Sequence, residues 1–139
     1  MSKEKNKENI QQKYLELQIL IKQINELQQQ ILVIQQQILE LRSLKENIGE
    51  LKDIKVNTET YIPLGLNIFT KAKLSENKEF LVGVGSNVLV PKTLEETIDL
   101  IEKQIEEIGK IIHELERQLS ELDLRGQVVQ EELVNLSKQ

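Results

Sequence analysis

Hydrophobic residues recur every three or four positions along both ends of the chain, and this spacing breaks only in the middle. In the first part, one position of a seven-residue repeat holds Ile or Leu, and the position three residues later does the same. In a helix these two positions lie on one face, which we call the first seam. It contains Ile10, Leu17, Ile24, Ile31 and Ile38 at one position and Leu20, Leu27, Ile34, Leu41 and Ile48 at the other, with Lys13 as a polar exception. No Pro or Gly interrupts these heptads, which predicts a coiled-coil helix of ~60 Å that ends near Gly49 with a glycine cap.

A second heptad pattern fills the last third of the chain. It follows Thr93-Leu94-Glu95-Glu96, in which a Thr is followed three residues later by a Glu, the signature of a capping box that starts a helix. The second seam contains Leu94, Ile101, Ile108, Leu115, Leu122, Val129 and Leu136 at one position and Ile98, Ile105, Ile112, Leu119 and Leu133 at the other. Only Gly126 interrupts it, at a cost of ~1 kcal/mol of helix stability relative to Ala.

The two predicted helices can pair with each other or with other chains. Pairing within the chain is favoured, because the middle segment returns the chain to where it left the first helix and only a modest loop must close. We therefore expect an antiparallel pair with Ile48 level with Leu94 and Leu17 near Arg125. Both chain ends would then lie at the same end of the pair.

The middle segment is rich in β-branched and aromatic residues that are cut by turn residues. Pro63, Gly65 and Gly85-Ser86-Asn87 mark its interruptions. The predicted strands are 58–63, 66–74, 79–85 and 88–91. In 66–74, alternate residues from Leu66 to Leu74 would share one half-buried face. Such short strands bury little apolar area and leave open edges, so we expect other subunits to complete the sheet.

The sequence thus predicts one mostly α-helical domain with a small β segment. An antiparallel two-helix coiled coil carries two β-hairpins at its base, and the strands of these hairpins need other subunits to complete their sheet. The parts are an N-terminal arm (1–55), a β-hairpin assembly segment (56–92) and a C-terminal arm (93–139).

Charge is unevenly distributed along these parts. Of the net charge of −5, residues 93–139 carry five Lys and Arg against twelve Asp and Glu, while the rest of the chain is close to neutral. An acidic arm repels phosphate backbones, so nucleic acid is not an expected partner. The polar start of the chain has no apolar run after it, and no stretch approaches the ~20 apolar residues of a membrane helix. We expect a cytoplasmic protein that does not bind membranes.

No residue constellation indicates catalysis, a cofactor or a metal. The chain has no Cys and a single His, His113, which falls outside the seam. Gly83-Val84-Gly85 lacks the third glycine, the Lys-Ser/Thr and the helix of a phosphate-binding loop, so strand glycines are the simpler interpretation. The sequence predicts neither an enzyme nor a cofactor or metal site.

Apolar residues outside the seams are the remaining unexplained feature. They are Leu15, Ile19, Leu32, Val33 and Leu39 on the first arm and Leu124, Val128 and Val134 on the second. They either widen the seam and contact a neighbouring arm, or they form a surface that holds other polypeptides. The candidates for such a surface, called the arm-end residues below, are Tyr14, Leu15, Ile19, Leu124 and Val128.

The order helix, two hairpins, helix resembles the α-type subunit of prefoldin, and two short motifs carry the resemblance. Tyr61-Ile62-Pro63-Leu64-Gly65 is similar to the L-V-P-V-G-like first hairpin of that family, and Val82-Gly83-Val84-Gly85-Ser86-Asn87-Val88 to its second. The sequence departs from the family at Leu66-Asn67, where a run of small residues is common, and at Asn87, where Gly is frequent.

The resemblance implies a specific assembly and activity. The assembly is a hexamer of two α-type and four β-type prefoldin subunits, in which the strands of the hairpins form an oligomeric β-barrel platform. It captures non-native polypeptides without ATP and delivers them to a group II chaperonin. The residues that would carry assembly are Tyr61, Ile62, Pro63, Leu64, Gly65, Val82, Gly83, Val84 and Gly85. A filament-forming relative of prefoldin and a scaffold coiled coil are the alternatives, and the hairpins count against the scaffold.

Overall fold

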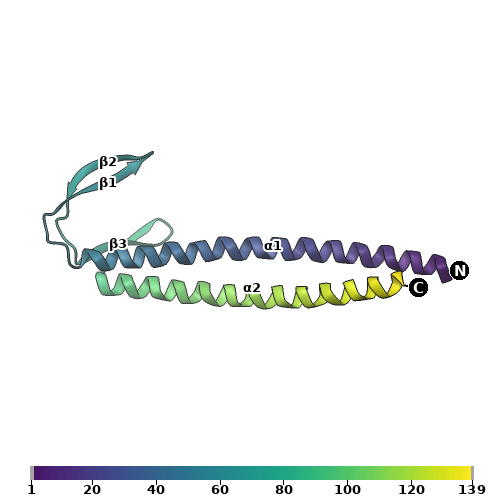
Figure 1. Ribbon diagram of the computed structural model, residues 1–139. Helices are drawn as coiled ribbons and strands as arrows, with labels where there is room; N and C mark the ends of the chain where they lie inside the picture. The colour runs from purple at the N-terminus through teal and green to yellow at the C-terminus, as the bar shows by residue number, and fades with distance from the viewer. Residues whose placement is uncertain (1, 139) are drawn as a thin grey trace. The chain divides into compact units, whose positions relative to one another are not determined.

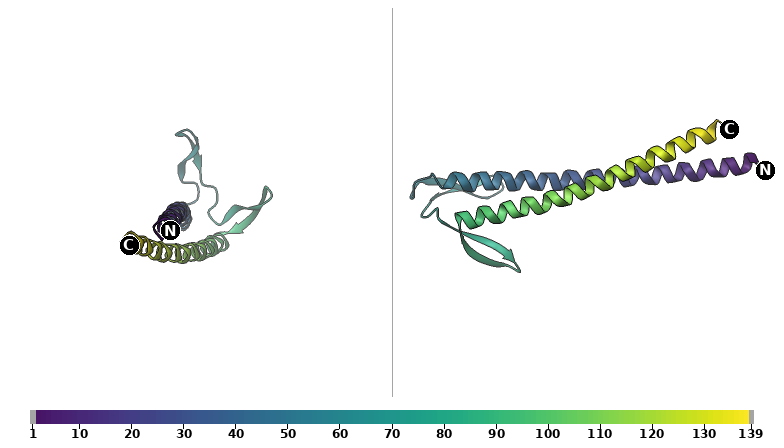
Figure 2. Two further views of the ribbon diagram at one scale, coloured as in Figure 1. Left: turned by 90° about the vertical axis from the view of Figure 1, so that its right-hand side faces the viewer. Right: turned by 90° about the horizontal axis from the view of Figure 1, so that it is seen from below.

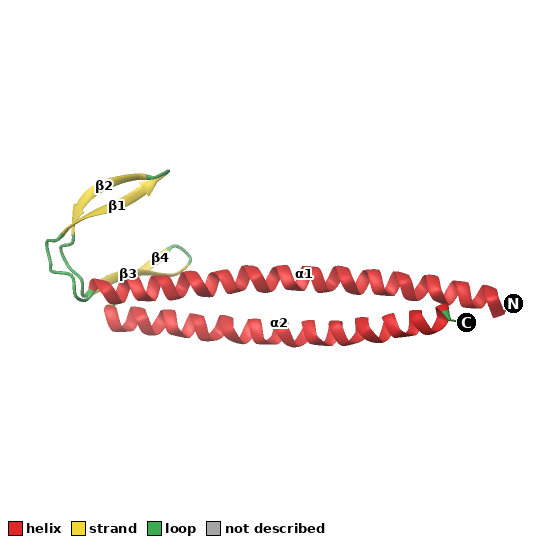
Figure 3. Ribbon diagram, viewed as in Figure 1, coloured by secondary structure: helices red, strands yellow, loops and turns green. Residues whose placement is uncertain are grey.

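Two long helices separated by two short hairpins make up the chain in a computed structural model, which describes residues 2–138 (Figures 1 and 3). The elements are α1 (Ser2–Leu51), β1 (Glu59–Gly65), β2 (Ile68–Lys73), β3 (Glu79–Gly85), β4 (Val88–Thr93) and α2 (Leu94–Ser137). The predicted fold class, two long helices with a small β segment between them, is confirmed. Neither described helix contains an apolar stretch of the length and hydropathy needed to cross a membrane.

The chain divides into two compact units, each of which contains part of both helices. The terminal unit comprises the described residues up to Gln37 and those from Ile108 onward, and the hairpin unit is Ile38–Glu107. In the terminal unit, the Asn6 side-chain amide donates a hydrogen bond of 3.3 Å to the Leu136 carbonyl. The first and last turns of the helices therefore lie side by side (Figures 1 and 2), as antiparallel pairing within the chain predicts.

The predicted seams form the contact between the helices in each unit. In the hairpin unit, Ile48, Leu94 and Ile101 form a buried cluster, so the expected level of Ile48 with Leu94 is confirmed. Half-buried Leu41, Phe80, Ile98 and Ile105 pack against this cluster. The buried seam residues of the terminal unit are Leu20, Leu27, Ile31 and Val129. Because each seam residue faces the other helix, apolar contact rather than helix propensity holds the pair together.

The first seam contains a second lysine, which the heptad pattern did not reveal. Lys45 lies seven residues after Ile38, at a position where the heptad calls for an apolar residue, and it is half-buried. Its ammonium lies 2.9 Å from a carboxylate oxygen of Glu102 on α2. The seam therefore tolerates Lys45 because the charge reaches an acidic partner at the edge of the contact.

The end of α1 differs from the predicted glycine cap. The helix continues through Gly49 to Leu51, and Gly49 is absent from the residues with positive φ. Hydrogen bonds of the 3₁₀ type, from the amides of Lys52 and Asp53 to the carbonyls of Gly49 and Glu50, close the last turn. The prediction of a left-handed glycine at the end of this helix is wrong, because other groups satisfy the last carbonyls.

The predicted capping box at the start of α2 is confirmed. The Glu96 amide donates to the Thr93 hydroxyl at 3.1 Å, and the Thr93 amide donates to the Glu96 carboxylate at 3.4 Å. The Thr97 hydroxyl adds a bond of 2.7 Å to the Thr93 carbonyl. The two bonds between Thr93 and Glu96 satisfy backbone amides that the first turn of a helix otherwise leaves without partners.

Each hairpin is a separate two-stranded antiparallel sheet, β1 with β2 and β3 with β4 (Figure 3). Both have the same turn. A glycine with positive φ, Gly65 or Gly85, precedes two further residues with positive φ, and the strand register shifts beside it. Two residues of positive φ are typical of type I′ hairpin turns, which favour Asn. The departures from the family at Leu66-Asn67 and Asn87 therefore fall at turn positions.

The prediction of a strand over 66–74 is wrong at its start. Leu66 and Asn67 form the turn, with φ of 50° and 61°, and β2 begins at Ile68. Leu66 is 95% exposed, and the residues of β2 are exposed on both faces apart from Ala72. A half-buried face is therefore not formed by one chain alone.

The capping box yields a test of the helix start. Replacing Thr93 by Ala removes the hydroxyl that accepts the Glu96 amide, and we expect a loss of about 1 kcal/mol in the free energy of unfolding. Urea unfolding followed by circular dichroism measures it. Ser120→Ala, an exposed position in the middle of α2, is the control and is expected to have no effect or to stabilise slightly. Equal destabilisation by both variants would contradict the role of the cap.

Candidate functional site

The arm-end residues all lie on exposed surface of the terminal unit. Leu15 and Ile19 are each 58% exposed, although they are large apolar side chains. They stand one helical turn apart on α1 and line a shallow groove between the two helices. Leu20 and Leu122 line the same groove. The structure thus brings two of the predicted residues together above the seam.

The other arm-end residues are exposed but do not line this groove. Tyr14, Leu124 and Val128 are each more than half exposed. Leu124 follows the seam residue Leu122 by two positions, which places it about 200° around the helix and away from α1. The arm-end residues therefore form several apolar strips around the two helices rather than one patch.

A charged network crosses the two helices beside this groove. Glu16 accepts a bond of 3.3 Å from Arg125 and lies 3.5 Å from the Lys13 ammonium. Lys13 in turn lies 2.6 Å from Glu132 on α2. These contacts confirm the expected pairing level, which placed Leu17 near Arg125. They link the helices at two points in the last turns of the arms.

Lys13 occupies a seam position, and its surroundings keep it charged. The hydrogen bond to Glu132, and the charges of Glu132 and Glu16, raise the pKa of Lys13 above its usual value. Its side chain is 35% exposed, so water still reaches it and the pairs contribute little to stability. A charged seam position weakens the apolar contact in this part of the arms.

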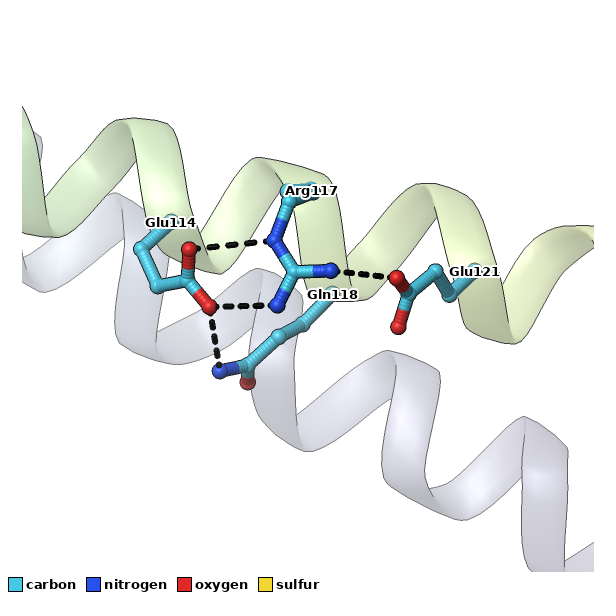
Figure 4. A network of polar contacts seen from close by, with 4 residues as sticks. All are labelled: Glu114, Arg117, Gln118 and Glu121. Carbon is cyan, nitrogen blue, oxygen red and sulfur yellow. Dashed lines mark hydrogen bonds and ion pairs between the residues drawn. The ribbon is translucent and has the colours of Figure 1, made fainter.

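A second charged network lies on α2 alone (Figure 4). Arg117 binds Glu114 through two of its nitrogens, at 3.0 and 2.6 Å, and reaches Glu121 one turn further on. Gln118 also donates to Glu114, at 3.4 Å. The hydrogen bonds between Arg117 and Glu114 lower the pKa of the Glu114 carboxyl and raise the pKa of the Arg117 guanidinium. Both groups therefore stay charged near neutral pH. All four residues are exposed at spacings of three and four, which indicates support of the helix rather than chemistry.

The predicted assembly residues lie on the hairpins, and their apolar side chains are largely uncovered. Every residue of β1 is exposed, including Tyr61 at 62% and Leu64 at 68%. On the second hairpin, Val84 is exposed, whereas Val82 is half-buried and pairs across the strands with Val90. The remaining predicted residues are Ile62 and Pro63 in β1, Gly65 and Gly85 at the turns, and Gly83 in β3. Within a single chain, none of the other described residues buries this apolar surface.

Gly83-Val84-Gly85 has none of the surroundings of a phosphate-binding loop. These residues end β3 and lead into a hairpin turn, not into a helix. A side chain at Gly83 would contact Leu89 on the neighbouring strand at 3.7 Å. Among residues 2–138, no group of three or more His, Cys, Asp or Glu side chains is placed to hold a metal.

Asn77, between the two hairpins, was missed by the sequence analysis. Its side-chain amide donates to the carbonyls of Leu51 and Ile54, each at 3.1 Å, at the end of α1. The sequence offers little signal for this contact, because an Asn in a polar loop is normally a turn residue and its partners lie more than 20 residues earlier.

Comparison with known proteins shows which family this architecture represents. The family model described as Prefoldin subunit matches residues 20–139. The chain belongs to the prefoldin family. Its members are subunits of oligomeric molecular chaperones, so the resemblance stated from the two hairpin motifs is confirmed.

Individual prefoldin relatives match along most of the chain. The Prefoldin subunit alpha of Methanopyrus kandleri is 32% identical over 126 residues, which cover 86% of this chain and 78% of the relative. The Prefoldin subunit alpha 1 of Methanocaldococcus jannaschii is 32% identical over 115 residues, covering 83% and 78%. The alpha subunit of Archaeoglobus fulgidus is 27% identical over 133 residues, covering 96% and 95%.

A solved structure shares the fold. The chain matches a chain of filamentous PFD from Methanocaldococcus jannaschii with a TM-score of 0.75, at 24% identity, and the match covers 86% of this chain and 95% of the other. Two helices joined by two hairpins are therefore an arrangement already seen in a prefoldin.

The seam lysine yields a test of how the arm ends are held. Replacing Lys13 by Leu puts an apolar residue at this seam position, and we expect the free energy of unfolding to rise by about 1 kcal/mol. Amide exchange in the last turns of both helices should slow. Lys22→Leu, which removes the same charge from an exposed position outside the seam, is the control and should leave both quantities nearly unchanged. Faster exchange in the Lys13 variant would show that the charged network, not the seam, closes the arm ends.

Proposed function

We propose that this chain is an ATP-independent chaperone subunit of the cytoplasm, which assembles through its hairpins and holds non-native polypeptides with its arm ends. The observation that carries the proposal is a contrast in burial. The seam residues between the helices are covered, whereas large apolar side chains on both hairpins and at the arm ends remain exposed. Exposed apolar surface of this extent on one chain indicates partners.

Assembly with β-type prefoldin subunits, in a hexamer of two α-type and four β-type subunits, accounts for the hairpins. A two-stranded sheet is at best marginally stable by itself, and each hairpin has two outer strand edges. Tyr61, Leu64 and Phe69 on the first hairpin, and Leu81 and Leu89 on the second, supply apolar side chains that pairing with other strands would cover.

Holding of non-native polypeptides accounts for the arm ends. The groove lined by Leu15, Ile19, Leu20 and Leu122 is shallow and open, which suits apolar segments of no fixed shape. Each such contact is weak, but several arms of one assembly acting on the same polypeptide gain from multivalency. Delivery of the polypeptide to a group II chaperonin is part of the same proposal, and its support is membership of the family.

A filament built from copies of this chain is the second candidate. It is favoured by the similarity to the subunit of filamentous PFD, which shares the fold over 86% of this chain. The two candidates use the same hairpin surface and differ in the partner that covers it. The mass of the assembly formed by the purified chain alone separates them, because a filament forms without β-type subunits.

The holding site can be tested by changing Leu15 and Ile19 together to Ser. We expect the assembled protein to suppress the aggregation of a denatured test protein about tenfold less effectively, because each arm loses apolar contact area and multivalency amplifies the loss. Light scattering of the test protein, with and without ATP, is the measurement. Addition of ATP should change neither the native nor the variant result.

The matched control for this variant is the double change of Leu32 and Val33 to Ser. These two residues are 57% and 60% exposed, as uncovered as Leu15 and Ile19, but they lie further along α1. The control should retain most of the holding activity. If instead it lost activity and the arm-end variant retained it, the holding site would lie on the inner part of the arm. ATP-dependent holding would contradict the proposed mechanism itself.

The role of the hairpins is tested at Val82. Proline at this position removes a backbone donor from β3, so we expect the assembly to dissociate while helix content stays high. Val82→Ala keeps the backbone donor and should leave the assembly largely intact. Sedimentation reports the mass and circular dichroism reports the helix content. Melting of the helices in an assembly of unchanged mass would reverse the proposed roles of hairpins and arms.

A further inference from the structure

The loop between the two hairpins contains a contact that ties the second hairpin to the helices. Asn77 has one side-chain amide nitrogen, and three backbone carbonyls surround it, one from the last residue of α1 and two from the turn that follows. The carbonyls of Leu51 and Ile54 accept at 3.1 Å, and that of Lys52 lies at a weaker 3.4 Å. The two amide hydrogens of Asn77 are thus shared between the last residue of α1 and the turn that follows it.

The end of α1 lacks two features that commonly stabilise the C-terminus of a helix. The last turn of a helix leaves carbonyls without partners and carries a partial negative charge. The last turn of α1 contains no basic residue, and Gly49 does not form the usual glycine cap. Backbone amides of the 3₁₀-type turn already donate to the carbonyls of Gly49, Glu50 and Leu51, and the Asn77 amide adds a side-chain donor to Leu51 and to the turn that follows it.

The residues after Asn77 contact α2 and the apolar cluster. The Lys78 carbonyl accepts a bond of 3.2 Å from the amide of Leu94, the first residue of α2. Phe80, at the start of β3, packs against the cluster that includes Ile48 and Leu94. The short segment from Asn77 to Phe80 thus contacts the end of one helix, the start of the other and the core between them.

The first hairpin is attached differently. Its base is closed by bonds between its own flanking residues, from the Asn57 amide to the Leu74 carbonyl and from the Leu74 amide to the Thr58 carbonyl. All residues of β1, and all of β2 except Ala72, are exposed. The second hairpin, by contrast, has Phe80 in the core and half-buried Val82 and Val90. Of the two hairpins, the second is the one that packs against the apolar cluster between α1 and α2.

We propose that Asn77 is a positioning residue: by capping the end of α1, its amide fixes the second hairpin on the helices and so sets the direction in which the arms leave the assembly. The inference rests on the proposed role of the hairpins in assembly. The geometry of the cap matters for function because several arms can bind the same polypeptide only if they point in the same direction.

The test replaces Asn77 by Asp, which has the same shape but no donor at neutral pH and adds a negative charge beside the carbonyls. Because the chain has no Cys, cysteines introduced at Ser86 and Lys103 can carry two spin labels, one on the turn between β3 and β4 and one on α2. Dilution of the labelled chain with unlabelled chain restricts the measured distances to those within one chain, whatever the state of assembly.

We expect a single narrow distance distribution for the native residue and a broad one for Asn77→Asp, with amide exchange at Lys52 to Ile54 about fivefold faster. Asn77→Ala removes the donors without adding charge and should also broaden the distribution. Asn67→Asp, which adds the same charge in the turn of the first hairpin, is the matched control and should leave it narrow. A narrow distribution in either Asn77 variant would overturn the proposal.

The functional measurement is suppression of aggregation by assemblies of native and Asn77→Asp chains. The proposal predicts assemblies of equal mass, because the hairpin surfaces are unchanged, and about threefold weaker holding by the variant, because disordered arm directions reduce multivalent contact. Equal holding by the two assemblies would contradict the role in arm direction. Failure of the native chain to hold the test protein would instead refute the proposed function, and the distance distributions would still decide whether Asn77 positions the hairpin.

Discussion

The antiparallel packing of Ile and Leu between α1 and α2 is the contact on which the other features depend. In each unit, the apolar side chains that face the opposite helix are buried or half-buried, whereas apolar side chains outside the seams, such as Leu15 and Leu124, are exposed. All the buried apolar side chains of the described residues belong to the two seams. The hairpins are therefore left with Phe80 as a link to the core and with apolar faces that the chain cannot cover. The need for partner subunits follows from how the sequence distributes its apolar residues.

Two lysines modify this apolar contact without breaking it. Lys13 in the terminal unit and Lys45 in the hairpin unit both occupy seam positions of α1, and each reaches a glutamate of α2, Glu132 and Glu102 respectively. An isolated polar residue in a coiled-coil seam lowers stability but restricts register, because other alignments leave the charge without its partner. Many neighbouring flank positions are neutral Gln, which discriminate poorly between alignments. The lysine pairs supply a preference for the observed antiparallel register.

The sequence predicted features that depend on local or periodic signals. The two seams, the capping box at Thr93 and the existence of two hairpins all follow from spacing and turn residues, and the family followed from the hairpin motifs. The start of β2 was misplaced because Leu66 has strand propensity, while the turn demands positive φ regardless of it. The cap of α1 was assigned to Gly49 because the contact with Asn77, 26 residues after Leu51, is not part of any repeat in the sequence. The arm-end residues were proposed from their positions around the seams and the assembly residues from the hairpin motifs, but their partners belong to other molecules.

The central claim is that the hairpins, and not the arms, bring subunits together. The mass of the native assembly, measured for the purified chain alone and mixed with β-type prefoldin subunits, tests it most directly. The account predicts that mixing produces one species containing two copies of this chain and four β-type subunits, and that this species is lost when Val82 is replaced by Pro. A chain that remains a single subunit in both samples, or a mixed assembly that tolerates the proline, would contradict it.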